Sequence, residues 1–213
     1  MLIAIDGPAA SGKGTLGRLI AAHYGLAHLD TGKLYRAVAR DVVAIGAAPA
    51  DTEAAFAAAK ALDLATLDDP ALMDGKLGEA ASLVASYPEV RDALLAYQRA
   101  FARRSTGAVL DGRDIGTVIC PDADVKLFVT ASADMRAARR YRELRQAGHN
   151  ITEADVLADI RRRDHRDKNR AAAPLRQAKD AYLLDTTNLD IDAASKAAIA
   201  LIDAAMGRAG QAG

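Results

Sequence analysis

Cysteine, tryptophan and long apolar runs are scarce in this sequence of 213 residues. Cys120 is the only cysteine, so no disulfide can form within the chain, and we expect a reducing, cytoplasmic compartment. No apolar stretch approaches the roughly 20 residues that cross a bilayer. The first predicted strand follows the initiating methionine without a basic leader or an apolar leader segment. These absences exclude a disulfide-built scaffold and predict a protein without a membrane partner.

Aromatic residues make up only 4% of the chain, whereas hydrophobic residues make up 51%, so the core must consist mainly of Ala, Leu, Val and Ile. Alanine favours helices, and we therefore expect many of them. The formal net charge is zero, which argues against a general nucleic-acid binder. Residues 136–170 nevertheless carry 11 Lys or Arg and only 6 Asp or Glu, which indicates a local anionic ligand. The histidines lack metal-ligand spacing, and we expect solvated or packing roles for His23, His28, His149 and His165.

A glycine-rich segment, GPAASGKGT at residues 7–15, directly follows the apolar run 2–6 and precedes a segment with helical spacing. Such a loop turns backbone N–H groups and one lysine toward phosphate oxygens, and the helix N-terminus adds a partial positive charge. Gly14, rather than Ser or Thr, follows Lys13, so the hydroxyl that often contacts Mg²⁺ is displaced to Thr15. The predicted phosphate-binding residues are Gly7, Pro8, Ala9, Ala10, Ser11, Gly12, Lys13, Gly14 and Thr15.

Short aliphatic runs alternate with helical patterns along the chain, which predicts an α/β fold with a parallel sheet covered by helices on both faces. The five predicted strands are residues 2–6, 27–30, 108–111, 125–129 and 182–185. Residues 34–104 contain no convincing strand, and helices are predicted at 34–45, 52–64, 76–85 and 88–104. We therefore expect a single domain with a core (1–30, 107–146, 176–213), a helical insertion (31–106) and a hinged lid (147–175).

Two clusters of charged residues follow the predicted strands. Asp30, Thr31 and Arg36 come after the second strand, where Thr31 and Arg36 can face an anion, although Asp30 or Thr31 can equally cap the next helix. Asp111, Arg113 and Asp114 come after the third strand. Asp111 is a candidate for holding a water bound to Mg²⁺, and a turn-capping role is the alternative.

A third cluster lies on a predicted helix, where Arg163, Arg166, Asp167 and Arg170 occupy positions i, i+3, i+4 and i+7 and so share one face. A solvated, self-paired helix face is the commoner meaning of such a pattern. The phosphate loop elsewhere in the chain favours a ligand role instead, because arginine grips phosphate oxygens bidentately and stays charged.

Together these segments closely resemble one family, the bacterial cytidylate kinases, within the nucleoside monophosphate kinases. The matching stretches span nearly the whole chain: residues 5–8 with 11–15, 30–32 with 35–36, 111–118, and 163–170 leading to 173–175. The last two are more specific than the phosphate loop. One departure lies around residues 49–76, where the family often has a longer insertion with extra short strands.

The resemblance implies a P-loop NTPase core with a helical nucleoside-monophosphate-binding insertion and a mobile lid. It also implies in-line transfer of a phosphate from ATP to CMP or dCMP with Mg²⁺ and no covalent intermediate, by a monomer. The implied catalytic residues are Lys13, Arg113, Arg166 and Arg170, and the implied metal contacts are Thr15 and Asp111, the latter through water. The implied CMP-binding residues are Thr31, Arg36 and Arg113 for the phosphate, Ser82, Arg91 and Asp114 for the base, and Arg163 and Asp167 for the sugar.

Two other functions stay open at this point. A kinase for UMP or a shikimate-like acceptor uses the same core but does not need both charged clusters, 111–114 and 163–170, together. A GTP-binding switch would need Asp-x-x-Gly after the third strand and Asn-Lys-x-Asp for guanine, and the sequence contains neither. A carboxylate such as Asp114 accepts a hydrogen bond from the cytosine amine but faces a carbonyl in uracil, which favours CMP.

Overall fold

A twisted parallel sheet forms the centre of this computed structural model, which describes residues 1–73 and 76–211. Its strands are β1 (Leu2–Asp6), β2 (Ala27–Asp30), β3 (Ala108–Gly112), β4 (Val125–Thr130) and β5 (Tyr182–Asp185). They lie in the order β2-β3-β1-β4-β5, and every pairing is parallel. The predicted strands and the α/β class are therefore confirmed, with β3 and β4 each one residue longer than expected.

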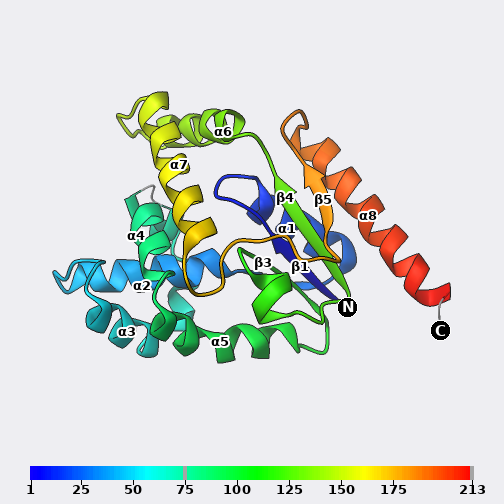
Figure 1. Ribbon diagram of the computed structural model, residues 1–213, viewed down its shortest axis with the longest axis horizontal. Coiled ribbons are helices and arrows are strands. Elements are labelled where there is room, and N and C mark those ends of the chain that lie inside the picture. The colour runs from blue at the N-terminus through cyan, green and yellow to red at the C-terminus, as the bar shows by residue number, and fades with distance from the viewer. Residues whose placement is uncertain (74–75, 212–213) are drawn as a thin grey trace.

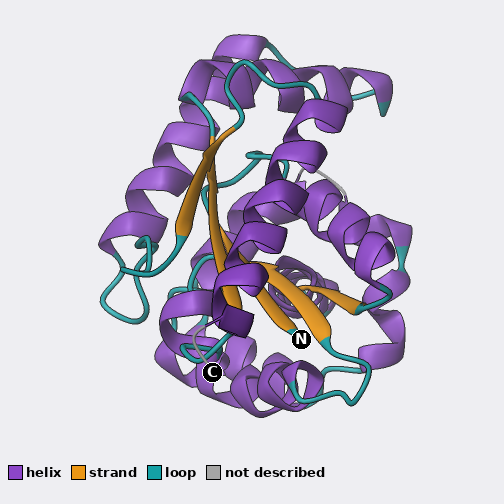
Figure 2. Ribbon diagram, turned by 90° about the vertical axis from the view of Figure 1, so that its right-hand side faces the viewer, coloured by secondary structure: helices purple, strands orange, loops and turns teal. Residues whose placement is uncertain are grey.

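Helices cover both faces of the sheet, as Figure 2 shows. Side chains alternate along β1, so Ile3 and Ile5 pack with α1 (Lys13–Tyr24) and α8 (Ile191–Gln211), while Ala4 packs on the other face. That second face is covered by α5 (Pro88–Ala102) and the short π-helical turn η3 (Ile115–Ile119). Burial on both faces explains why the strands read as nearly continuous apolar runs in the sequence.

A helical unit with its own apolar core connects β2 to β3. It comprises α2 (Thr31–Ala44), α3 (Thr52–Lys60), the 3₁₀ turns η1 (Leu64–Asp68) and η2 (Pro70–Met73), α4 (Lys76–Val84) and α5. The predicted start of α2 at Leu34 is wrong, because the helix begins at Thr31 directly after β2. The predicted end of α3 at Leu64 is also wrong, because Asp63 accepts a hydrogen bond from the Ala65 N–H and starts η1 instead.

The helices α6 (Ala133–Gln146) and α7 (Glu153–Asn169) pack against each other, and α7 also reaches α4 (Figure 1). Arg136 joins them through a bidentate ion pair with Asp164, with N···O distances of 3.0 and 2.6 Å. The same guanidinium donates to the Ala9 carbonyl at 3.1 Å, and the Ala10 side chain packs against the small apolar cluster between the helices. This pair of helices is thus attached to residues 7–12 as well as to the sheet.

Within the part of the chain that the structure describes, no helix combines the length and the apolar character needed to span a bilayer. The division into core, insertion and lid stays a prediction. Two short stretches of it, residues 74–75 in the insertion and 212–213 in the core, lie outside the described residues.

Cys120 follows η3 and is only 3% exposed, and burial raises the pKa of its thiol to about 11. Since the thiolate is the reactive form, we expect a thiol reagent at pH 8 to modify the folded protein at least about 100-fold more slowly than the urea-unfolded chain. The measurement is the rate of colour release from an aromatic disulfide reagent. Equal rates in the two states would contradict the burial of this thiol.

Candidate functional site

Residues 7–12, which we call the donor loop, connect β1 to α1 at the carboxyl edge of the sheet. Gly7 allows close approach, since a Cβ there would lie 2.0 Å from the Val129 carbonyl oxygen. Gly12 has φ +86°, a left-handed conformation that suits glycine, and it precedes the first residue of α1. The backbone therefore adopts the tight turn that aims a helix N-terminus at an anion.

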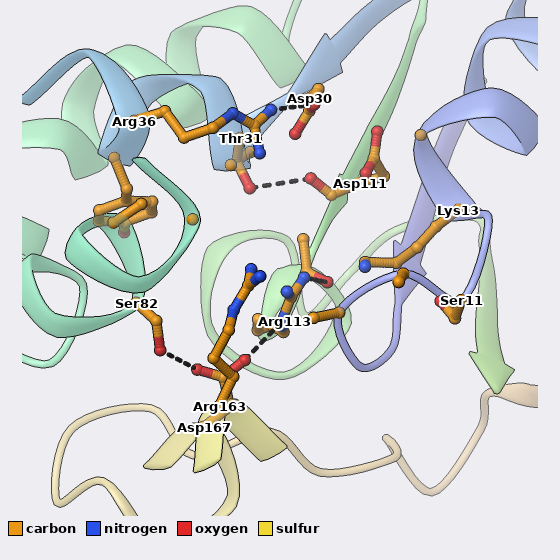
Figure 3. Close-up of a pocket in the computed structure, with 18 of the residues that line it drawn as sticks. Ser11, Lys13, Asp30, Thr31, Arg36, Ser82, Asp111, Arg113, Arg163 and Asp167 are labelled. Atoms are coloured by element: carbon orange, nitrogen blue, oxygen red, sulfur yellow. Dashed lines mark hydrogen bonds and ion pairs between the residues drawn. The ribbon is translucent and has the colours of Figure 1, made fainter. Parts of the chain in front are cut away.

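Lys13 is buried, and its Nζ donates to the Pro8 carbonyl at 2.9 Å. Burial, with the positive charge of Arg113 nearby, lowers the pKa of Lys13 to about 7. In Figure 3 the Lys13 and Arg113 side chains face each other across the pocket. An anion that enters between them would be drawn to both cations.

Asp30, Thr31 and Arg36 lie together at the start of α2. Arg36 Nη2 pairs with Asp30 Oδ2 at 2.6 Å, and Thr31 Oγ1 donates to the Asp111 carbonyl at 2.8 Å. Burial alone would raise the pKa of Asp30, but Arg36 holds it below its usual value. Asp30 is the N-cap residue of α2 and its side chain makes no capping hydrogen bond, so the predicted capping role is wrong: its carboxylate binds Arg36 instead.

Asp114 forms a buried cluster with two arginines from distant segments. Arg91 of α5 pairs with its Oδ2, and Arg170 Nη2 lies 3.3 Å from its Oδ1. Arg91 also donates to the Tyr35 hydroxyl at 3.3 Å. All three charged side chains are less than one-tenth exposed, so this end of the pocket presents a fixed carboxylate and fixed donors.

Asp167 of α7 connects the second cluster. Ser82 Oγ donates to its Oδ1 at 3.1 Å, and Arg113 Nε donates to its Oδ2 at 2.7 Å. Arg163, one turn earlier, points into the middle of the pocket in Figure 3. Its Nε is buried without a hydrogen-bond partner, its Nη1 is 4.0 Å from Asp159, and burial lowers its pKa to about 10. A guanidinium held this loosely is available to an anion.

The structure thus gathers most of the predicted site residues around one pocket. The pocket lining includes Ala9, Ala10, Ser11, Gly12, Lys13, Gly14, Thr15, Thr31, Arg36, Ser82, Arg91, Asp111, Arg113, Asp114, Arg163, Asp167 and Arg170. Gly7, Pro8 and Arg166 are absent from it, and Arg166 Nη2 instead pairs with Glu79 Oε1 of α4 at 2.5 Å. Of the four charged residues that were predicted to share one helix face, Arg163, Asp167 and the C-cap residue Arg170 line the pocket, whereas Arg166 does not.

Several polar residues at the site were not predicted. His28 Nε2 lies 2.8 Å from Asp111 Oδ2, so His28 pairs with a carboxylate rather than solvent, and burial raises the pKa of Asp111. Arg139 lines the pocket and donates to the carbonyls of Thr186 and Leu189 at 2.6 and 3.1 Å. The excess of basic residues in 136–170 was a signal for Arg139. No local pattern links His28 to Asp111, which is 83 positions away.

Asp6 lies in the family-like stretch 5–8, but no role was predicted for it. It ends β1, is 4% exposed, and accepts hydrogen bonds from the backbone N–H groups of Ile115 and Gly116, both at 2.7 Å. Burial raises its pKa to about 6, although the two amides and Lys13 act in the opposite direction.

Among residues 1–73 and 76–211 there is no group of three or more His, Cys, Asp or Glu side chains placed to hold a metal ion. A nucleotide-bound Mg²⁺ does not need one, because it takes most ligands from phosphates and water and only one or two from carboxylates. Asp111 and Asp30 fit this pattern, since a Cβ at Gly14 would lie 3.9 Å from a carboxylate oxygen of each. Thr15 is exposed, and its hydroxyl accepts from Arg18 at 3.3 Å.

A parallel sheet whose first strand leads into a glycine-lined phosphate loop and a helix defines a P-loop nucleotide-binding protein. The family model for cytidylate kinase matches residues 3–204. A relative from Nitrobacter winogradskyi named cytidylate kinase is 58% identical over 212 residues, all of both chains. Another of that name from Methylocella silvestris is 60% identical and covers 96% of this chain and 95% of its own. The chain belongs to the cytidylate kinase family.

A solved structure of an uncharacterized protein from Eubacterium ventriosum covers 95% of this chain and 98% of its own. It superposes with a TM-score of 0.57 at 16% identity, which shows a shared fold.

The raised pKa of Asp6 predicts a pH dependence of stability. The unfolded chain has an ordinary Asp pKa, so the folded state binds more protons between about pH 4 and 6, and Asp6 makes the fold less stable as pH rises through about 6. From pH 4 to 7.5 the unfolding free energy of wild type should fall by about 2 kcal/mol relative to that of Asp6→Asn, in which this group cannot titrate. Urea titrations of both proteins measure the difference. Parallel pH profiles would contradict the shift.

Proposed function

We propose that this pocket transfers the γ-phosphate of ATP to CMP or dCMP and so gives ADP and CDP or dCDP. The observation that carries the proposal is the placement of Lys13 from the start of α1 and Arg113 from the β3 edge on the two sides of one pocket. That pocket also contains the buried Asp114, a group suited to a cytosine amine. Relatives named cytidylate kinase over the full chain length support the same reaction.

The donor side would bind ATP through the donor loop and the start of α1. The triphosphate would replace the Pro8 carbonyl as the partner of Lys13 Nζ, and the backbone N–H groups of the loop would hold the β- and γ-oxygens. The residues assigned to ATP are Gly7, Pro8, Ala9, Ala10, Ser11, Gly12, Lys13, Gly14 and Thr15. Asp111, through water, and Thr15 would hold Mg²⁺, which when bound offsets the negative charge of the phosphates.

The acceptor side would bind CMP along the insertion and α7. Thr31, Arg36 and Arg113 would hold its phosphate, Ser82, Arg91 and Asp114 its base, and Arg163 and Asp167 its sugar. The Asp114 carboxylate accepts from the cytosine amine but repels the O4 carbonyl of uracil, a difference worth about 1–3 kcal/mol. Arg91 holds the Asp114 carboxylate in place, and Arg113 does the same for Asp167.

The transfer step needs no strong general base, because the attacking CMP phosphate oxygen is already ionised. Positioning and charge stabilisation then account for the rate. Lys13 and Arg113 would stabilise the transferring group. Arg166 and Arg170 would join them only after leaving Glu79 and Asp114, and we propose that movement of the lid, residues 147–175, brings this about and excludes water. The single cysteine, which is free and buried, favours a reducing, cytoplasmic compartment, and we propose that the protein acts as a monomer.

Lys13→Met should lower kcat at least tenfold with the fold retained, because it removes a cation that stabilises the transferring phosphate. A coupled assay of ADP release with ATP and CMP measures this, and circular dichroism checks the fold. Lys33→Met is the matched control, since Lys33 pairs with the exposed Asp68 outside the pocket lining and should keep normal turnover. Normal turnover in Lys13→Met would remove this residue from the reaction.

Base selectivity tests the acceptor assignment. With CMP, dCMP, UMP, AMP and shikimate assayed in parallel, wild type should prefer the two cytidylates, and Asp114→Asn should reduce the CMP-over-UMP preference in kcat/KM at least about tenfold. A preference for UMP or shikimate in wild type would point to the alternative kinases. Slow GTP turnover that is independent of every acceptor would instead indicate a binding switch.

A further inference from the structure

Asp6 joins the two halves of the site. It is the last residue of β1 and comes immediately before Gly7 of the donor loop. In β1 its side chain alternates with that of Ile5, so it lies on the η3 side of the sheet, opposite α1. Each carboxylate oxygen accepts one backbone N–H, from Ile115 and from Gly116. One residue at the base of the donor loop therefore holds the chain just beyond Arg113 and Asp114.

The backbone at Gly116 is enclosed from two sides. A Cβ at this position would lie 3.1 Å from Cδ of Lys126 and 3.4 Å from Oδ2 of Asp6. The Lys126 ammonium is fixed in turn by Asp180 at 2.7 Å and by the Pro121 carbonyl. Without the Asp6 hydrogen bonds, only Lys126 would hold the backbone at Gly116. The residues just before it, including Asp114, would then be less firmly placed.

A carboxylate suits this position because two consecutive N–H groups need two acceptors. Asparagine has the same shape but offers one acceptor oxygen and one NH₂ donor, which would oppose the second N–H. Burying the charge is costly, and the raised pKa of Asp6 reflects that cost. The buried Asp6 carboxylate is costly, but without it the N–H groups of Ile115 and Gly116 would be buried without acceptors.

We propose that Asp6 is a positioning residue for acceptor selectivity: its carboxylate fixes the backbone at Ile115 and Gly116 and thereby places the Asp114 side chain against the base. This inference rests on the proposed role of Asp114. It assigns Asp6 to the acceptor half of the reaction, although its position in the sequence is next to the donor loop. Asp6 itself does not line the pocket and does not touch a substrate.

The test is the CMP-over-UMP ratio of kcat/KM in Asp6→Asn. Loss of one hydrogen bond that positions Asp114 should lower the ratio about tenfold, mainly through a higher KM for CMP, whereas the Kd for ATP should change less than about twofold. Asp124→Asn is the matched control, because it makes the same chemical change at an exposed carboxylate that accepts a backbone N–H, that of Leu2 at 2.7 Å, at the opposite end of β1. Its ratio should equal that of wild type.

A purely structural role predicts a different pattern. If Asp6→Asn lowers kcat/KM equally for CMP and UMP, or weakens ATP binding while the ratio stays constant, the proposal is overturned. Asp6→Asn combined with Asp114→Asn should lose no more selectivity than Asp114→Asn alone, since both act through one carboxylate. Additive losses would also overturn it.

Two further outcomes distinguish a failure of the proposed role of Asp114 from a failure of the inference about Asp6. Selectivity unchanged in Asp114→Asn defeats the base-reading role itself, whereas selectivity lost in Asp114→Asn but kept in Asp6→Asn defeats only the present inference. If Asp6→Asn does not fold, Asp6→Ser serves in its place, because a single, shorter hydroxyl cannot accept from both the Ile115 and the Gly116 N–H groups. A wild-type ratio in Asp6→Ser would then overturn the proposal.

Discussion

Pairing of the pocket's cations with protein oxygens organises the site, with Arg163 the most loosely held of them. Lys13 uses a carbonyl of its own loop, Arg36 uses Asp30, Arg91 uses Asp114 and Arg113 uses Asp167. Because a buried charge without a partner is strongly unfavourable, these pairs fix side chains from distant segments in one place. The same groups that could bind two polyanions are thus held in position before either arrives.

The same ion pairs and hydrogen bonds connect the sheet, the helical unit between β2 and β3, and α7. Asp30 belongs to the sheet and Arg36 to α2, while Ser82 of α4 and Arg113 of the β3 edge share the carboxylate of Asp167 on α7. Three structural units therefore meet at carboxylates inside the pocket, in addition to the apolar contact of α5 with the sheet. Contacts of this kind can be exchanged for phosphate oxygens with little change in the number of hydrogen bonds.

Local patterns were sufficient for much of the fold. Apolar runs bounded by polar residues gave all the strands of the sheet, and the spacing of Gly7, Gly12 and Lys13 gave the donor loop, because both features depend on neighbouring residues. Helix ends were less predictable: α2 begins at Thr31 and α3 ends at Lys60, where competing turns decide the boundary. The partners of Arg166 and His28 could not be derived, since Glu79 and Asp111 are more than 80 positions away and only the tertiary fold brings them close.

The donor loop and α7 are linked through one arginine of α6. One guanidinium, Arg136, holds both the Ala9 carbonyl and the Asp164 carboxylate, while a single methyl group of Ala10 supplies the apolar contact. A methyl contributes only about 1 kcal/mol, so the buried ion pair of Arg136 with Asp164, rather than the apolar contact, holds this junction together. A shift of the Ala9 peptide would therefore change the hydrogen bonds of the same guanidinium that holds α7, the helix that carries Arg163 and Asp167.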